Sequence, residues 1–145
     1  LDGNEKMGKS LGNAIYLCDS DEAITKKVMS AVTDPNRIKK DDLGNPDVCM
    51  VYYYHKLFNS DKDCQKICDE CRRGKRGCVA CKKQLINNII HELKPMRKRR
   101  DYYEKHPDEV EKILLEGTEK ARIEARKNMV LIKKAMKLDY FSDRM

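Results

Sequence analysis

Apolar residues recur at helical spacing in several segments of the chain and predict mainly α structure. The first segment ends near Val32, and Asp19 and Glu22 have the spacing of a capping box at its start. Its buried side is expected to consist of Ile24, Val28, Ala31 and Val32. Two prolines, a glycine and several turn formers follow between residues 33 and 46, so the chain is expected to change direction there.

Four further helices are expected after this turn. They run from Pro46 to Phe58, from Asp61 to Arg73, from Val79 to about Lys105 and from Pro107 to about Leu138. Pro46 and Pro107 suit the first turn of a helix, whereas Pro95 is expected to kink the long fourth one. The inner face of that helix is expected to be Leu85, Ile86, Ile89, Ile90 and Leu93. No strand-like alternation is present, so the fold class is a mainly α helical bundle preceded by a loop.

The composition of the chain restricts the classes of partner that it could bind. Charged residues make up 38% of the 145-residue chain, and the formal net charge is +7, which favours polyanionic partners such as nucleic acid or nucleotide phosphates. No apolar run reaches the roughly 20 residues of a membrane span, and no targeting segment is recognisable, so we expect a soluble, cytoplasmic protein. The chain opens at Leu1 within a glycine-containing loop, and we expect it to be a piece of something longer.

The opening loop contains a candidate phosphate-binding motif. Lys6 and Lys9 lie three residues apart around Met7 and Gly8, and Ser10 follows. Two ammonium groups, a hydroxyl and free backbone N–H groups in a flexible loop could stabilise the charge that builds on a leaving pyrophosphate. A solvated basic loop would have the same composition.

Cysteines form a second candidate site. Five of the seven lie between Cys64 and Cys81, and without a signal segment such clustering favours a metal over disulfides. Cys71, Cys78 and Cys81 are separated by six and two residues, a spacing that suits a metal or cluster. Cys68 would complete two Cys-x-x-Cys pairs, as in a compact zinc site, and Cys49 is the other candidate fourth ligand. Cys64 and Cys68 could instead be buried thiols.

Basic residues surround these cysteines. Six of them and no acid lie between residues 72 and 83, and the candidate RNA contacts among them are Arg72, Arg73, Lys75 and Arg76. A second basic run, Lys94 to Arg100, precedes Tyr102 and Tyr103, which could stack on unpaired bases or belong to the core. Either run could also be a solvated face.

Three stretches of the sequence resemble a known family. DGNEKMGKSLGNAI, at residues 2–15, resembles the KMSKS signature loop of class I aminoacyl-tRNA synthetases, with Gly8 in place of serine. VMSAVTDPNRI, at 28–38, and HPDEVEKILLEGTEKARIEA, at 106–125, are similar to segments of bacterial-type tryptophanyl-tRNA synthetases. The resemblance extends from Leu1 to about Leu138 and is weakest around the cysteines.

The resemblance implies an enzyme that activates tryptophan with ATP and transfers it to tRNA(Trp). Residues 1–18 would be the edge of a Rossmann-type catalytic domain whose remainder is missing, and residues 19–145 a helical anticodon-binding domain. Lys6 and Lys9 would be the catalytic phosphate ligands, and Met7, Gly8 and Ser10 would add contacts to ATP, which such enzymes use with Mg²⁺. The full-length enzyme would be a homodimer, and this chain alone would be inactive.

The resemblance also bears on the cysteines. A subset of tryptophanyl-tRNA synthetases carries a 4Fe-4S cluster held by one distant cysteine and three more at intervals of six and two. Cys49, Cys71, Cys78 and Cys81 fit that arrangement, with 21 residues in the long gap, so we favour a structural cluster over Zn²⁺. The alternative function is a non-catalytic, zinc-containing nucleic-acid-binding module, and the enzyme rival is tyrosyl-tRNA synthetase.

Overall fold

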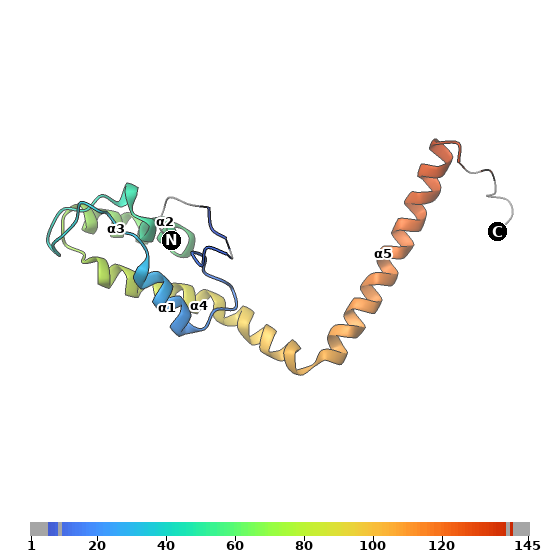
Figure 1. The fold of residues 1–145 in the computed structure, drawn as a ribbon, viewed down its shortest axis with the longest axis horizontal. Coiled ribbons are helices and arrows are strands. Elements are labelled where there is room, and N and C mark those ends of the chain that lie inside the picture. Colours follow the sequence, from blue (N-terminus) through green and yellow to red (C-terminus); the bar gives the residue numbers. More distant parts are fainter. Residues whose placement is uncertain (1–5, 9, 139, 141–145) are drawn as a thin grey trace. The chain divides into compact units, whose positions relative to one another are not determined.

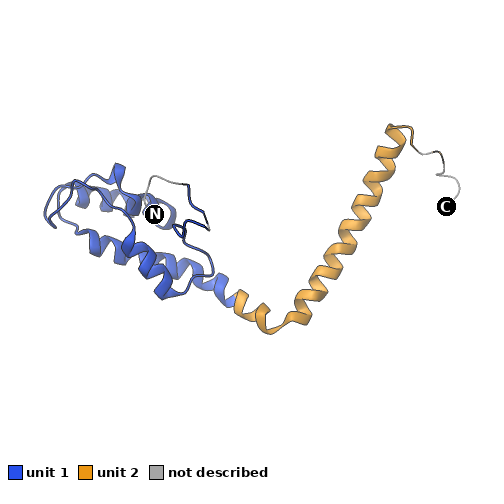
Figure 2. Cartoon of the chain, viewed as in Figure 1, with its two compact units in different colours: residues 1–98 blue, residues 99–145 orange. Residues whose placement is uncertain are grey.

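The fold consists of helices joined by loops, as expected for a mainly α chain. A computed structural model describes residues 6–8, 10–138 and 140, and within these residues it contains no strand. The helices are α1 (Asp21–Ser30), the short 3₁₀ turn η1 (Pro46–Val48), α2 (Met50–Phe58), α3 (Asp61–Arg72), α4 (Cys78–Lys105) and α5 (Pro107–Ala135) (Figure 1). The chain divides into two compact units, residues 1–98 and 99–145, at a boundary within α4 (Figure 2).

The core of the first unit joins α1, α2 and α4. Its buried members are Ile24, Val28, Ala31, Val51, Leu85, Ile86, Ile89 and Leu93, and Ile90 packs against them partly exposed. The expected inner face of α4 is therefore confirmed. Val32 was expected to be buried, but it lies beyond the end of α1 and is largely exposed. A smaller cluster of Tyr52, Ile67 and Cys68 packs α2 against α3.

The start of α1 lies one residue later than the capping-box pattern indicated. Ser20 is the N-cap, and its Oγ accepts a hydrogen bond from the Ala23 N–H at 3.2 Å. Asp19 does not cap the helix. Its carboxylate accepts hydrogen bonds from the Tyr16 N–H at 2.8 Å and from Lys27 Nζ at 2.5 Å. The prediction that Asp19 caps the helix was wrong, because the side chain turns back to the preceding loop.

The expected second helix is in fact two elements. Pro46–Val48 forms a 3₁₀ turn, the chain is extended at Cys49 (φ −95°, ψ 113°), and α2 begins at Met50. The bounds of α3 and α4 agree with the sequence to within a residue, and α4 continues through Pro95. The last helix ends at Ala135, three residues before the expected end.

The segment between α1 and η1 is held by a buried carboxylate and two close approaches. Asp34 accepts hydrogen bonds from the Asn36 and Asn45 N–H groups at 2.9 and 2.8 Å. A Cβ added at Gly44 would lie 2.6 Å from Cys71 Sγ, and one at Gly74, whose φ is +68°, would lie 2.4 Å from the Asp41 carbonyl oxygen. Glycine at 44 and 74 therefore lets this segment pack directly on the end of α3.

The second unit is dominated by α5, which has no buried residue. Pro107 occupies its first turn, Asp108 and Glu109 follow, and the N-cap His106 makes no side-chain capping bond. Among the described helices, none combines the length and apolar character that crossing a bilayer requires.

Candidate functional site

The described part of the KMGKS loop, residues 6–8 and 10, is followed by a segment that joins it to the helical unit, and the two together contact that unit at two points. Tyr54 Oη of α2 donates to Met7 Sδ at 3.2 Å, and further along the chain Ile15 packs against the main core. Between them, Gly8 N–H donates to Asn13 Oδ1 at 3.0 Å, and Leu11 N–H to the Gly8 carbonyl at 3.3 Å. These contacts hold a compact turn beside α2.

Two candidate phosphate-binding side chains of this loop face solvent. Lys6 and Ser10 are exposed, whereas Lys9 lies outside the described residues, so its placement stays a prediction. A Cβ added at Gly8 would meet only Leu11 and Ser10, at 3.9 and 4.0 Å, which are ordinary contacts. The serine that Gly8 replaces in the signature motif would therefore fit at this position.

Four cysteines that are distant in sequence line one small cavity. Cys49 precedes α2, Cys71 lies in the last turn of α3, and Cys78 and Cys81 lie in the first turn of α4. Together with Thr33, Arg37, Val51 and Arg76 they line a cavity of about 20 Å³. Cys68 does not line it, because its side chain is buried in the neighbouring cluster with Tyr52 and Ile67, against which Cys49 and Cys81 also pack. The cavity therefore contains the set with Cys49 as the fourth member.

The electrostatics of the cavity are those of half-buried thiols beside two guanidinium groups. Burial raises the pKa of Cys49 and Cys71, and it raises the pKa of Cys81 to about 12. Arg37 opposes the shift at Cys71 and donates from Nη1 to its Sγ at 3.7 Å, while Arg76 opposes the shift at Cys81. As free groups these three are thiols at neutral pH, and a bound cation is what would favour their thiolate forms.

The side chains around the cavity suit a metal or cluster in their chemistry but not in their spacing. Thiols are suitable ligands, and the Nε of Arg37 is buried with no hydrogen-bond partner in the described part of the chain, so a donor is available beside the sulfurs. Within the same described residues, however, no three His, Cys, Asp or Glu side chains are grouped so that they could hold a metal ion. The chemistry of the residues fits, but the sulfurs would have to rearrange around any centre.

His55 is a neighbour of the cavity that the sequence did not single out. It is fully buried, its Nε2 lies 3.2 Å from the Cys81 carbonyl oxygen, and Asn59 Nδ2 donates to its Nδ1 at 2.8 Å. Burial lowers the pKa of His55 to about 4, so the ring is neutral at pH 7. The only sequence signal was its place on the inner face of α2, which any core residue shares.

The four candidate RNA contacts near the cysteines differ in their surroundings. Arg72 pairs with Asp47 at 3.0 Å on the surface. Arg76 is largely buried, and it donates to Glu70 Oε2 at 2.8 Å and to Gln84 Oε1 at 2.7 Å, which ties the end of α3 to α4. Arg73 and Lys75 are exposed, and no ion pair of theirs is found among the described residues. Of the four, these two are best placed to meet a phosphate.

Two arginines of the second basic run form ion pairs with acidic side chains. Arg97 forms an ion pair with Asp21 of α1, and Arg100 pairs with Glu104 at 2.7 Å within α4. Tyr102 and Tyr103 are both exposed, so they are not core residues, and the Tyr102 ring stacks on His106 with centroids 4.2 Å apart.

Comparison with known proteins gives a consistent result. The family model described as tRNA synthetases class I (W and Y) matches residues 1–94. The tryptophan–tRNA ligase of Aquifex aeolicus is 44% identical over 134 residues, which are 92% of this chain and 34% of that protein. The tryptophan–tRNA ligase of Streptococcus pyogenes serotype M3 is 43% identical over 97% of this chain and 42% of its own length. The chain therefore spans about two fifths or less of these relatives.

Solved structures agree with the sequence comparison. Tryptophanyl-tRNA synthetase from Campylobacter jejuni, complexed with ADP and tryptophan, superposes with a TM-score of 0.80 at 26% identity. The superposition covers 93% of this chain and 41% of that one. A second structure of the Campylobacter jejuni enzyme gives a TM-score of 0.78 at 25% identity.

Proposed function

Because the chain belongs to the class I tRNA synthetases for tryptophan and tyrosine, we propose that it is part of a tryptophan–tRNA ligase. The observation that carries the proposal is the 43–44% identity to tryptophan–tRNA ligases over more than nine tenths of the chain. In this proposal residues 1–18 belong to the edge of the catalytic domain, and residues 19–145 form the helical domain that meets the anticodon of tRNA(Trp).

The proposed reaction begins with attack of the tryptophan carboxylate on the α-phosphate of ATP. Tryptophanyl-adenylate forms and pyrophosphate leaves. A hydroxyl at the 3′ end of the tRNA then attacks the carbonyl carbon of the adenylate, so that the tryptophanyl group moves to the tRNA and AMP leaves. Lys6 and Lys9 stabilise the negative charge that develops on the leaving pyrophosphate. This charge is larger in the transition state than in bound ATP. Met7, Gly8 and Ser10 add contacts from the same turn.

The test of this proposal uses the full-length protein that carries this chain. Lys9→Ala should slow tryptophan-dependent pyrophosphate exchange by about two orders of magnitude or more while leaving tryptophan binding nearly unchanged. Lys26→Ala, an exposed lysine of α1, is the matched control. A normal exchange rate in Lys9→Ala would remove this lysine from the mechanism, and exchange with tyrosine in place of tryptophan would assign the protein to the other branch of the family.

The cysteine cavity is proposed to hold a structural 4Fe-4S cluster on Cys49, Cys71, Cys78 and Cys81. Such a cluster would supply four metal–thiolate bonds that connect α3, α4 and the residue before α2. What supports this set is the shared cavity, which excludes Cys68. Arg37 and Arg76 beside the sulfurs would stabilise thiolate charge.

Iron and zinc analysis of anaerobically purified protein distinguishes the alternatives. Wild type should contain about four irons per chain. Cys49→Ser should lose the metal, whereas Cys68→Ser, its matched control, should keep it. One zinc per chain that survives Cys49→Ser and is lost with Cys68→Ser would overturn both the cluster and the ligand set.

Contact with the tRNA is proposed for the exposed members of the basic loop. Arg73→Ala with Lys75→Ala should weaken tRNA binding and reduce the slope of log affinity against log salt by up to about two units, one for each lost phosphate contact. Arg76→Ala is a poor test of contact because it breaks the bonds to Glu70 and Gln84. Unchanged affinity and slope in the folded double variant would make this loop a solvated face.

A further inference from the structure

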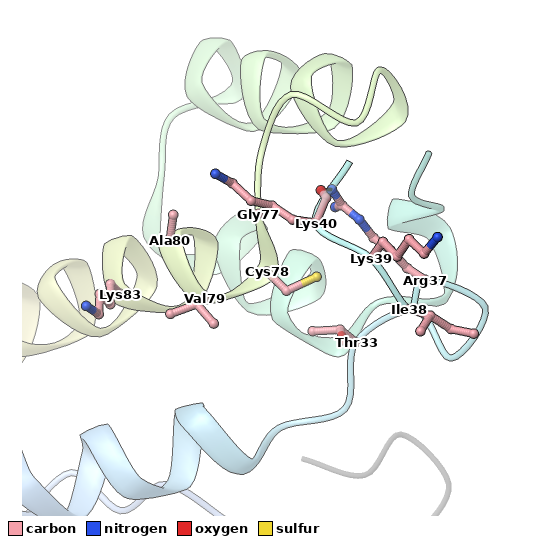
Figure 3. A pocket seen from close by; sticks show the side chains of 10 residues that line it. All are labelled: Thr33, Arg37, Ile38, Lys39, Lys40, Gly77, Cys78, Val79, Ala80 and Lys83. Carbon is pink, nitrogen blue, oxygen red and sulfur yellow. Dashed lines mark hydrogen bonds between the residues drawn. The ribbon is translucent and has the colours of Figure 1, made fainter. Parts of the chain in front are cut away.

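A larger cavity lies next to the cysteine cavity and has no role in the functions proposed above. It has a volume of about 560 Å³ and is formed by the segment after α1 and the first turns of α4 (Figure 3). Thr33, Arg37 and Cys78 line both cavities. Its size is within the range of about 300–1,000 Å³ that small-ligand sites have.

Two kinds of side chain line this cavity. The first kind is basic, and its members are Arg37, Lys39, Lys40 and Lys83. None of the ten described residues that line the cavity is acidic. In a chain with 24 acids, a wall of four cations without one acid is a local concentration of positive potential.

The second kind is apolar and exposed. Ile38 is 90% exposed and Val79 is 56% exposed, and neither contributes to the core. They belong to opposite sides of the cavity, Ile38 to the segment after α1 and Val79 to the first turn of α4 (Figure 3). An apolar surface bordered by cations suits a ligand that is itself flat and apolar at one end and anionic at the other.

We propose that this cavity holds one unpaired nucleotide of the tRNA, with its base between Ile38 and Val79 and its phosphates at Lys39 and Lys40. Nucleobases that leave the stack are commonly held between aromatic or apolar side chains, and lysines neutralise the adjoining phosphates. The inference rests on the proposed tRNA ligase function, and it names where that domain takes a base. A free mononucleotide has the same chemistry, so the test must separate the two sources.

The main variant is Val79→Asp, which puts a negative charge on the apolar wall. Val79 lies in the first turn of α4 and is 56% exposed, and an acid is favourable at that end of a helix, so the substitution should leave the fold intact, which circular dichroism checks. The matched control is Leu43→Asp, an exposed apolar residue that does not line the cavity. Lys39→Ala with Lys40→Ala is compared with Lys133→Ala and Lys134→Ala at the exposed end of α5.

Binding is measured with tRNA(Trp) and with a set of tRNAs in which each unpaired anticodon-loop base is replaced in turn by an abasic site. Val79→Asp should weaken binding of the intact tRNA by about 10-fold, the range that loss of one base contact gives, and Leu43→Asp should not. One abasic tRNA should bind wild type and Val79→Asp equally, because the base that meets Val79 is gone. The Lys39 and Lys40 double variant should weaken binding more than the α5 pair.

Three outcomes would overturn the proposal. Val79→Asp and Leu43→Asp could weaken binding to the same extent, or Val79→Asp could remain weaker than wild type with every abasic tRNA. A free nucleoside monophosphate that binds wild type as tightly as the tRNA, and loses affinity in Val79→Asp, would assign the cavity to a small molecule. If neither the wild type nor any variant binds tRNA(Trp), the proposed ligase function is wrong. That result is distinguishable from a failure of the nucleotide site alone.

Discussion

The first compact unit and α5 have the same kind of amphipathic sequence and use it differently. In residues 1–98, apolar positions at helical spacing become a core in which Ile24, Leu85 and Ile89 are buried. In α5, residues such as Leu114, Leu131 and Ile132 recur in a similar way, yet none is buried. The comparison shows that periodicity predicts a helix more reliably than it predicts what the helix packs against.

The forces that hold the two regions differ accordingly. Burial of apolar surface at about 25 cal/mol per Å² is the main stabilising term for the first unit. For α5 the described contacts are local, such as the Lys112–Glu116 and Lys127–Glu124 pairs at 4.0 and 2.8 Å. Exposed pairs of this kind contribute only about 0.2–0.5 kcal/mol each. We therefore expect substitutions to have large and cooperative effects in the first unit and small, local effects in α5.

The largest expected effect is that of Ile89→Ala. Ile89 is 1% exposed at the centre of the main core, so truncation should lower the free energy of unfolding by about 2–5 kcal/mol. Leu114→Ala, at a position that is 64% exposed, should change it by no more than about 0.5 kcal/mol. Urea titrations followed by circular dichroism measure both. Similar losses in the two variants would mean that α5 is covered in solution, and the comparison would fail.

A pair of glycine substitutions gives an intermediate effect of opposite sign in the two regions. Gly74→Ala should destabilise the first unit by about 2 kcal/mol or more, because φ is +68° and the new Cβ would meet the Asp41 carbonyl oxygen. Gly117→Ala should stabilise α5 by about 1 kcal/mol, since its Cβ would enter open space within a helix. Amide hydrogen exchange reports each region separately. Slower exchange throughout the chain in Gly117→Ala would mean that the regions unfold together.

The smallest expected effect comes from exchanging the charges of Lys112 and Glu116. Lysine precedes glutamate here, which is the weaker order on a helix, so Lys112→Glu with Glu116→Lys should strengthen α5 by about 0.2 kcal/mol. The gain should appear in the exchange rates of α5 amides and disappear in 1 M salt, where the Debye length is about 3 Å. A gain that persists in high salt would have to come from helix propensity instead of charge.

Sequence patterns predicted the helices well and their ends less well. The inner face of α4 could be read from Leu85, Ile86 and Ile89 because burial follows the period of the helix. Asp19 could not be placed, because Ser20 is an equally good cap and the choice depends on Lys27, which α1 brings back toward the loop. The break at Cys49 was missed because a 3₁₀ turn beginning with proline has the same local signals as an α-helix.

For the candidate sites too, the sequence pattern identified residue types but not which residues the fold brings together. Intervals of six and two residues singled out Cys71, Cys78 and Cys81, but only the packing of α2 on α3 buries Cys68 with Tyr52 and Ile67 and leaves Cys49 as the fourth cysteine that lines the cavity. Arg72 and Arg76 looked like RNA contacts because they are basic, whereas their partners Asp47 and Glu70 lie 25 and 6 residues earlier in the chain. Nothing in the sequence marked Arg37 or Val79 as part of a cavity wall, since that wall is made by residues from two separate segments.

The close approach of Gly44 to Cys71 makes the order of substitution matter. With cysteine at 71, any side chain at 44 would have to displace the sulfur, because its Cβ would lie 2.6 Å from that atom. Once Cys71 is replaced by alanine, the nearest remaining atom is Arg37 Nη1 at 3.2 Å, at the end of a flexible side chain that needs to shift only slightly, so position 44 becomes more permissive. The reverse route is closed, since a chain that first acquires a side chain at 44 cannot regain the cysteine without strain. Loss of the cysteine site would thus be easy to acquire and hard to undo, and laboratory evolution started from a Cys71→Ala parent should accumulate changes at 44 that make restoration of Cys71 destabilising.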